Sequence, residues 1–281
     1  MTSLVLSSAR HSYKLYQRDP DQPTLVFVHG WMLSRHYWQP LCDRLSPYNC
    51  LTYDLRGFGD SAAGNDTRYD LISYARDLLE LIDSLELTRV WLVGHSMGGS
   101  IALWAANLAP ERVDGVFCVN AGGGIYLKEE FERFRAAGQQ IVKLRPSWLA
   151  QLPGLAWYFC RDNVVSPLDK DWGKRRLIDF VAADAAAARG SLLESTTEAE
   201  VHQLPQIVQR LTQPAYFFAG ANDTVMEPKY VHHLASFHPS YRTENIVFEL
   251  PECGHLGMLE QTGAIANRIL SLLAAAPAHS A

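Results

Sequence analysis

Short apolar runs alternate with longer segments of helical periodicity along most of the chain. The runs are rich in β-branched and aromatic residues, end at turn residues, and occupy 24–30, 49–55, 89–95, 115–121, 214–220 and 245–251. Because they are apolar almost throughout, rather than alternating with polar residues, they are typical of parallel strands covered on both faces. The alternation predicts a mostly parallel, doubly wound α/β sheet flanked by helices.

The segments between these runs complete the predicted fold. Apolar residues recur at helical spacing over 69–87, 97–113 and 255–276, and the residues up to about Arg18 suit an antiparallel edge hairpin. The stretch from Ile125 to Leu211 contains only helical segments and is too long for a loop, so we expect a helical lid inserted into the sheet domain. The predicted division is a first core part at 1–124, a lid at 125–211 and a second core part at 212–281.

The middle of the predicted lid is unusually aromatic. Trp148, Trp157 and Tyr158 lie within fifteen residues of one another, with few charged residues between them. Such side chains either pack an insertion onto its core or line an apolar pocket. We expect these three to contribute to a substrate pocket, with Trp31 at its entrance.

Composition agrees with one large soluble domain. The chain has 281 residues, of which 48% are hydrophobic and 20% charged, and its net charge is −5. The calculated pI is about 6.0. The basic residues are scattered, so neither nucleic acid nor an anionic membrane is an expected partner. No apolar run approaches the ~20 residues of a membrane-spanning helix.

Cysteine usage and the N-terminus indicate a cytoplasmic protein. The five cysteines form no C-x-x-C pair and their number is odd, so we expect reduced thiols. The first residues have no basic start and only a short apolar patch, which is unlike a signal peptide.

One motif carries nucleophile chemistry. Gly94-His95-Ser96-Met97-Gly98 fits G-x-S-x-G and lies between a predicted buried strand and a predicted helix. This is the context of a nucleophile elbow, in which a sharp turn holds the serine outward and small neighbours let the backbone pass. The alternative is a glycine-rich turn with an incidental serine. The context favours Ser96 as a nucleophile.

A serine needs a base and an orienting acid. His255 follows the last predicted strand, at the sheet edge where ligands gather, and is favoured over His202, His232 and His233. We expect His95 to have a packing role.

Asp223 follows the preceding strand and completes the chain order Ser96, Asp223, His255 expected for an α/β-hydrolase arrangement. Asp114 and Glu227 are the competing acids, and Asn120 carries no charge. Two backbone amides are expected to stabilise an oxyanion, that of Met97 after the serine and that of Trp31 in the His29-Gly30-Trp31 turn.

Together these pieces resemble the α/β-hydrolase superfamily. The resemblance rests on HGW at 29–31, DLRGFGDS at 54–61, GHSMGG at 94–99, Asp223 and GH at 254–255. It spans about 22–125 and 210–275, with the divergent insertion at the family's lid position. It implies a hydrolase in which the D-x-R-G-x-G-x-S loop is structural. A serine nucleophile argues against the family's epoxide hydrolases and haloalkane dehalogenases, which use aspartate.

The resemblance and the apolar lid lead to one preferred function. We expect a carboxylic-ester hydrolase of the esterase and lipase type, acting on a small hydrophobic ester through an acyl-enzyme, with no metal and no cofactor. Two alternatives stay open, a carbon–carbon bond hydrolase of dienoate ring-cleavage products and a slow-turnover ligand receptor. The first would need cationic groups, for which Arg133, Arg135 and Arg161 are candidates. A monomer and a homodimer are equally compatible with the sequence.

Overall fold

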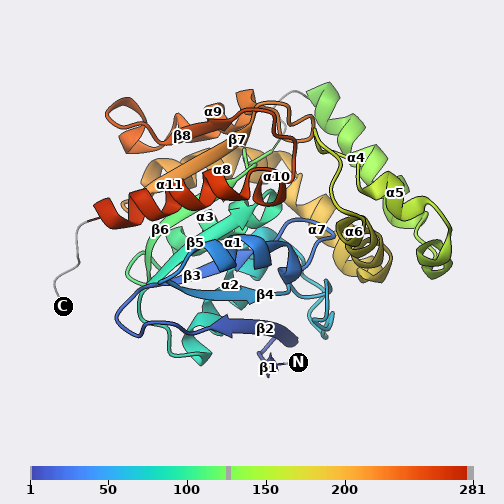
Figure 1. Cartoon of the computed structure of the whole chain (residues 1–281), viewed down its shortest axis with the longest axis horizontal. Coiled ribbons are helices and arrows are strands. Elements are labelled where there is room, and N and C mark those ends of the chain that lie inside the picture. The colour runs from blue at the N-terminus through green and yellow to red at the C-terminus, as the bar shows by residue number, and fades with distance from the viewer. Residues whose placement is uncertain (1, 125–127, 277–281) are drawn as a thin grey trace.

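The core is a single mostly parallel sheet (Figure 1). In the computed structural model, which describes residues 2–124 and 128–276, eight strands pair in the order β1-β2-β4-β3-β5-β6-β7-β8. Their bounds are β1 (Thr2–Val5), β2 (Arg10–Tyr16), β3 (Thr24–Val28), β4 (Asn49–Tyr53), β5 (Val90–His95), β6 (Val113–Val119), β7 (Ala215–Gly220) and β8 (Val247–Leu250). β1 and β2 are antiparallel to their neighbours and all other pairs are parallel. The predicted edge hairpin and doubly wound sheet are therefore confirmed.

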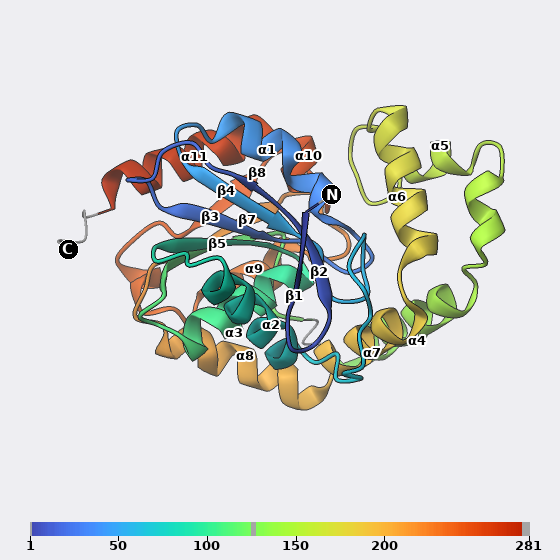
Figure 2. The ribbon, with the colours of Figure 1, turned by 90° about the horizontal axis from the view of Figure 1, so that it is seen from below.

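Helices cover both faces of the sheet (Figure 2). The helices of the sheet domain are α1 (Gln39–Arg44), α2 (Leu71–Ser84), α3 (Met97–Leu108), α8 (Glu198–Arg210), α9 (Pro228–Ala235), α10 (Gly257–Glu260) and α11 (Thr262–Ala275), with the 3₁₀ turns η1 (Arg35–Trp38) and η3 (Pro239–Arg242). Side chains of α2, α3, α8 and α9 are buried against one face, and those of α1, α10 and α11 against the other. The central strands β3, β4 and β5 are buried at every position, which explains their continuous hydrophobicity.

The C-terminal segment differs from the prediction of one helix over 255–276. It forms α10 and α11, separated at Gln261, whose φ of −126° and ψ of 38° are not helical. His255 therefore lies in the loop between β8 and α10, where its side chain can turn toward the sheet edge instead of being fixed on a helix face.

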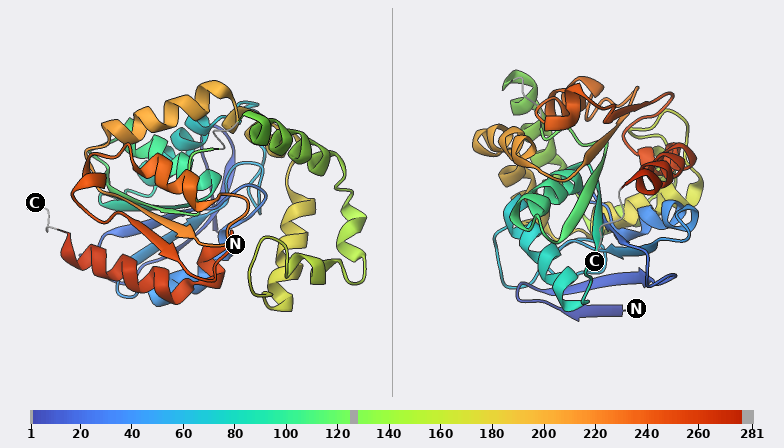
Figure 3. Two further views of the ribbon diagram at one scale, coloured as in Figure 1. Left: turned by 90° about the horizontal axis from the view of Figure 1, so that it is seen from above. Right: turned by 90° about the vertical axis from the view of Figure 1, so that its left-hand side faces the viewer.

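Helices between β6 and α8 extend to one side of the sheet (Figures 1 and 3). They are α4 (Lys128–Lys143), the 3₁₀ turn η2 (Ser147–Gln151), α5 (Leu155–Phe159), α6 (Lys170–Ala182) and α7 (Ala185–Ser195). We call α4, η2, α5 and α6 the arm. α8 returns to the sheet and packs on α3. The lid boundaries at 125 and 211 stay a prediction, and residues 125–127 lie outside the described residues.

Polar bonds attach the arm to the sheet domain. Ser34 donates its hydroxyl to Asp179 of α6 at 2.7 Å, and just after α6 the Asp184 amide donates to the Gly57 carbonyl at 2.8 Å. The rings of Tyr37 and Trp172 lie 5.6 Å apart. Along the part of the chain that the structure describes, no helix combines the length and apolarity needed to cross a bilayer.

Candidate active site

Ser96 occupies a strained turn between β5 and α3. Its φ is 52° and its ψ −123°, a conformation that a residue with a side chain rarely adopts. The turn is held by a hydrogen bond from the Ser96 amide to the Val119 carbonyl at 3.0 Å, and by one from the Gly99 amide to the Ser96 carbonyl at 2.9 Å. The hydroxyl is thereby presented at the carboxyl edge of the sheet.

The neighbouring glycines are required by close backbone approach. A Cβ on Gly98 would lie 2.3 Å from the carbonyl oxygen of Val28 and 2.5 Å from that of His29. A Cβ on Gly94 would lie 2.3 Å from the Gly98 carbonyl oxygen, and one on Gly99 would lie 2.4 Å from Cβ of Ala121. The start of α3 therefore packs directly on the loop after β3, which no larger residue would allow.

His255 reaches the serine from the loop after β8. Its Nε2 lies 3.2 Å from Oγ of Ser96, and its Nδ1 lies 2.8 Å from Oδ2 of Asp223. Since a carboxylate only accepts, Nδ1 carries the hydrogen in that contact and Nε2 is left to accept from the serine hydroxyl. Ser96, His255 and Asp223, the residues predicted as nucleophile, base and acid, are thus joined in a continuous hydrogen-bonded series.

Asp223 follows β7 and is 3% exposed. Oδ1 accepts from the amides of Val225 and Met226, both at 2.9 Å, while Oδ2 accepts from His255 and from Nδ2 of Asn120, both at 2.8 Å. Burial by itself raises the pKa of Asp223, but the attraction of His255 and these hydrogen bonds outweigh burial and hold the pKa below its ordinary value. The carboxylate is therefore charged at neutral pH.

The competing acids lie elsewhere. Asp114 is at the start of β6, far along the strand from the serine, and pairs with Arg89 at 3.5 Å. Glu227 precedes α9 and pairs with Lys229 at 2.9 Å. Among the discounted histidines, His232 pairs with Glu249 at 2.8 Å. None of these contacts involves Ser96.

Three residues around the series were not identified from the sequence. Asn120, at the end of β6 with a φ of 50°, donates both to Asp223 and, at 3.0 Å, to the Gly254 carbonyl. Glu260 accepts from the amides of Gly254 at 3.1 Å and Leu256 at 3.2 Å, on either side of His255. Asn120 and Glu260 thus support the acid and the histidine loop.

The third residue, Asn163, connects the segment after α5 to the histidine loop. Its carbonyl accepts from the His255 amide at 2.8 Å. A Cβ on Gly254 would lie 2.7 Å from that carbonyl oxygen, so the two segments touch along their backbones. Glu260 adds a bond to the Val165 amide at 2.7 Å. The sequence shows an Asn at position 120 and a Glu five residues after His255, but it does not show which groups these two side chains bond.

His95 is buried beside His255, with ring centroids 4.8 Å apart. Its Nε2 donates to the His255 carbonyl at 2.7 Å, and its Nδ1 is buried with no hydrogen-bond partner among the described residues. Burial, followed by repulsion from His255, lowers the pKa of His95 to about 3, so the ring is neutral. Its side chain turns away from the serine and packs under the histidine loop, as the sequence led us to expect.

The two amides expected to bind an oxyanion flank Ser96. Met97 begins α3, where an amide has no acceptor within its own helix. Trp31 lies in the loop that Gly98 contacts, and its indole Nε1 donates to the Ala188 carbonyl of α7 at 2.9 Å. Both residues line the same cavity as Ser96. Their role as donors remains a proposal.

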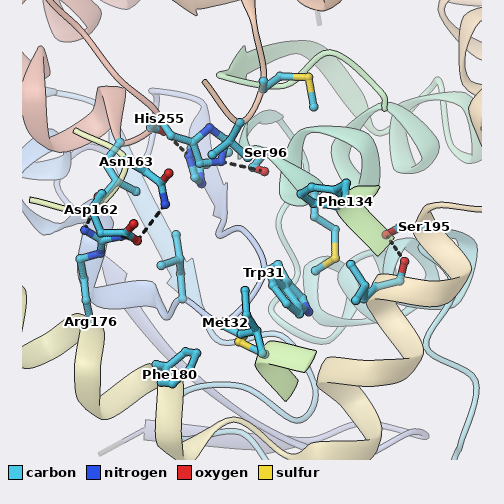
Figure 4. Close-up of a pocket in the computed structure, with 18 of the residues that line it drawn as sticks. Trp31, Met32, Ser96, Phe134, Asp162, Asn163, Arg176, Phe180, Ser195 and His255 are labelled. Atoms are coloured by element: carbon cyan, nitrogen blue, oxygen red, sulfur yellow. Dashed lines mark hydrogen bonds and ion pairs between the residues drawn. The ribbon is translucent and has the colours of Figure 1, made fainter. Parts of the chain in front are cut away.

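This cavity has a volume of about 570 Å³ and opens beside Ser96 and His255 (Figure 4). Its walls come from the sheet domain and from α4 to α7. Apolar side chains dominate, namely Trp31, Met32, Leu33, Met97, Phe134, Ile141, Tyr158, Phe159, Phe180, Leu192, Val225, Met226 and Leu256. A polar stretch of wall is formed by Asp162, Asn163 and Arg176.

Two of the four predicted pocket residues line the cavity, Trp31 and Tyr158. Trp148 and Trp157 do not, and they are 57% and 59% exposed. Successive helical residues point about 100° apart, so along the short α5 Tyr158 reaches the cavity wall, although it is itself 55% exposed, while Trp157 does not.

Comparison with known proteins agrees with the fold. A family model described as alpha/beta hydrolase fold matches residues 23–262. The chain is 31% identical over 214 residues to the 2-succinyl-6-hydroxy-2,4-cyclohexadiene-1-carboxylate synthase of Serratia proteamaculans, covering 74% of this chain and 80% of that protein.

Solved structures of similar fold include an esterase from Exiguobacterium antarcticum, with a TM-score of 0.80 and 20% identity over 98% of this chain and 99% of that one. Another is the enol-lactonase from Burkholderia xenovorans LB400, with a TM-score of 0.76 and 21% identity over 97% and 100%. On the strength of the strand order, the serine turn and the family match over most of its length, this chain belongs to the α/β-hydrolase fold family.

Proposed function

We propose that the chain is a serine hydrolase that cleaves a carboxylic ester of a hydrophobic substrate. The observation that carries the proposal is the hydrogen-bonded series from Ser96 through His255 to Asp223, at the edge of an apolar cavity. A strained serine beside an imidazole that is itself oriented by a charged carboxylate has the arrangement needed to generate an alkoxide nucleophile. Helices α4 to α7 would act as the lid over the bound substrate.

In the proposed reaction, Oγ of Ser96 attacks the ester carbonyl carbon and its proton passes to Nε2 of His255. The carbonyl electrons move to oxygen, where the amides of Trp31 and Met97 would stabilise the negative charge. The carbonyl reforms, the carbon–oxygen bond to the alcohol breaks, and His255 returns the proton to the leaving alkoxide. Water then attacks the acyl group by the same steps and releases the acid and free Ser96.

The cavity wall favours an ester over a carboxylate-bearing substrate. Arg176 is the cationic side chain among the described lining residues, and its guanidinium already donates to the Asp162 carbonyl at 2.7 Å and to the Asp162 carboxylate at 3.2 Å. Arg133, Arg135 and Arg161, the cations considered from the sequence, are absent from the described lining. An anionic substrate group would therefore meet a cation that is already neutralised.

The likeness to a synthase named for a cyclohexadiene carboxylate makes carbon–carbon chemistry on a carboxylate substrate the second candidate. The two candidates are separated by turnover. p-Nitrophenyl esters from acetate to laurate should be hydrolysed, with kcat/KM rising with chain length. A dienoate ring-cleavage product should not be turned over. Turnover of the dienoate without hydrolysis of any of these esters would favour the carbon–carbon hydrolase instead.

A fluorophosphonate probe tests the nucleophile independently of the substrate. We expect covalent labelling of the native chain and none of the Ser96→Ala variant. Labelling without steady-state turnover of any ester would instead favour a slow-turnover receptor. Failure to label, in a folded protein, would contradict the role proposed for Ser96.

A further inference from the structure

Large apolar side chains are exposed mainly in one short segment. Among the residues whose side chains the structure describes, ten large apolar residues are exposed and seven of them fall between 141 and 165. We call these seven the arm-tip patch, which consists of Ile141, Leu144, Trp148, Leu152, Trp157, Tyr158 and Val165. The other three, Val5, Leu108 and Phe237, are far apart in the chain. An apolar patch of this extent is a mark of an interaction site.

η2 and α5, with the patch residues between 148 and 158, belong to the part of the arm that projects farthest from the sheet (Figures 1 and 2), whereas Val165 lies nearer the sheet, where its amide donates to Glu260 at 2.7 Å. η2 and α5 contact each other and α6, so the segment is packed from within while its outer side chains face solvent. The exposed fraction is 69% for Leu144, 57% for Trp148 and 59% for Trp157. Because this part of the arm projects, it can contact another surface without steric hindrance from the sheet domain.

Exposed cations lie beside the exposed tryptophans. Between Ile141 and Leu168 the exposed charged side chains are Lys143 and Arg161, and the exposed Asp169 follows this stretch directly. Asp162 is partly buried, and its carboxylate is bonded to Arg176 at 3.2 Å. The guanidinium of Arg161 lies 3.8 Å from the ring centroid of Trp157. Within residues 141–168 the exposed charged side chains are therefore cationic, although the whole chain carries a net charge of −5. At physiological ionic strength, charges farther away than about 8 Å are screened, so a docked surface responds mainly to the tip.

We propose that the arm-tip patch docks on the surface of a phospholipid bilayer. Tryptophans beside cationic side chains match the interfacial region, where indoles sit at headgroup depth and Lys or Arg pairs with lipid phosphates. Ile141 and Tyr158 belong both to the patch and to the cavity wall, so docking directs the cavity toward the lipid. A second copy of the chain is the competing occupant. A projecting tip offers it little of the ~800 Å² that each partner buries in a standard interface.

Docking is measurable without turnover, which separates it from the proposed ester hydrolysis. The Ser96→Ala chain is sedimented with phosphatidylcholine vesicles containing 30% phosphatidylglycerol. We expect binding, weakened about tenfold or more by Trp148→Ser together with Trp157→Ser. Lys143→Glu with Arg161→Glu should weaken it by a similar factor, because each cation near a lipid surface contributes about 1 kcal/mol. Vesicles of phosphatidylcholine alone should bind severalfold less protein.

Matched controls remove apolar surface and charge elsewhere. Val5→Ser with Phe237→Ser, and Arg44→Glu with Arg210→Glu, should leave vesicle binding within about twofold. The tip variants should fold, because their side chains are more than half exposed or point to solvent. As a measurement that does not depend on these variants, brominated lipids should quench tryptophan fluorescence of the Ser96→Ala chain. The conservative Trp148→Phe with Trp157→Phe pair should lose that quenching.

Three results would overturn the proposal. The first is absence of both sedimentation and quenching with either vesicle. The second is equal loss of binding in the control variants. The third is a dimer in lipid-free buffer that the Trp148→Ser and Trp157→Ser pair dissociates, which would assign the patch to a second copy.

Discussion

Replacing Gly98 with alanine tests how closely the site depends on backbone packing. The added Cβ would lie 2.3 and 2.5 Å from the carbonyl oxygens of Val28 and His29, whereas ordinary contact begins at 3.4 Å. Both neighbours are backbone atoms of a buried strand end, so they cannot rotate away. The start of α3 must therefore move by about 1 Å from the loop that carries Trp31. A displacement of that size can cost about a hundredfold in rate, equal to about 2.7 kcal/mol in activation free energy.

The assay is steady-state hydrolysis of p-nitrophenyl butyrate with thermal denaturation of the same samples. We expect Gly98→Ala to lower kcat by about a hundredfold with a smaller change in KM, because the moved amide of Met97 is proposed to act on the transition state. Overpacking should also cost about 1–3 kcal/mol of unfolding free energy.

The matched control is Gly263→Ala in α11. A Cβ there would meet only Nη1 of Arg44, at 4.0 Å, so the substitution should leave kcat unchanged. It should also stabilise the helix by about 0.5–1 kcal/mol. A folded Gly98→Ala enzyme with kcat within twofold of the native value would refute the reasoning.

Three further predictions follow from the carboxylates of Asp223, Glu260 and Asp179. Asp223→Asn should lower kcat by about 10⁴-fold in the same ester assay, because an amide no longer fixes the His255 tautomer; a loss below tenfold would argue for another acid. Glu260→Gln should lower kcat about tenfold with KM little changed, because Oε1 of Glu260 accepts from both amides beside His255 while Oε2 accepts from Val165, and an amide nitrogen in place of either oxygen cannot accept; an altered KM alone would contradict this role. Burial raises the pKa of Asp179 to about 6, so the folded chain keeps a proton that the unfolded chain releases near pH 4. Raising the pH from 4 to 7 should therefore destabilise the native chain relative to Asp179→Asn by up to about 3 kcal/mol, measured by urea unfolding at each pH; a difference independent of pH would exclude the shift.

The sheet and the clustering of the three proposed reacting residues could be predicted because each has a local signal. Ser96 follows an apolar run and precedes a helical one, and Asp223 and His255 each follow a strand. Carboxyl ends of parallel strands meet at one edge, so strand-end residues distant in sequence are expected together there. This expectation holds whatever the structure of the helices that connect the strands.

The supporting residues and the pocket wall could not be predicted in the same way. Asn120 is uncharged and so is not a candidate acid. Its side-chain amide nevertheless donates two hydrogen bonds, one to Asp223 and one to the Gly254 carbonyl. The contact of Asn163 with His255 depends on how the arm folds back. Trp157 and Tyr158 are adjacent and chemically alike, and only the orientation of a five-residue helix decides which one faces the cavity.

The backbone bond between Asn163 and His255 has a consequence for engineering this scaffold. The backbone amide of His255 donates to the carbonyl of Asn163, which belongs to the inserted segment, and Glu260 accepts from the nearby Val165 amide. Exchanging the insertion for that of a relative would therefore also exchange part of the support of His255, the proposed base. A chimera should retain activity only when residues 163–165 and 254–260 come from the same parent.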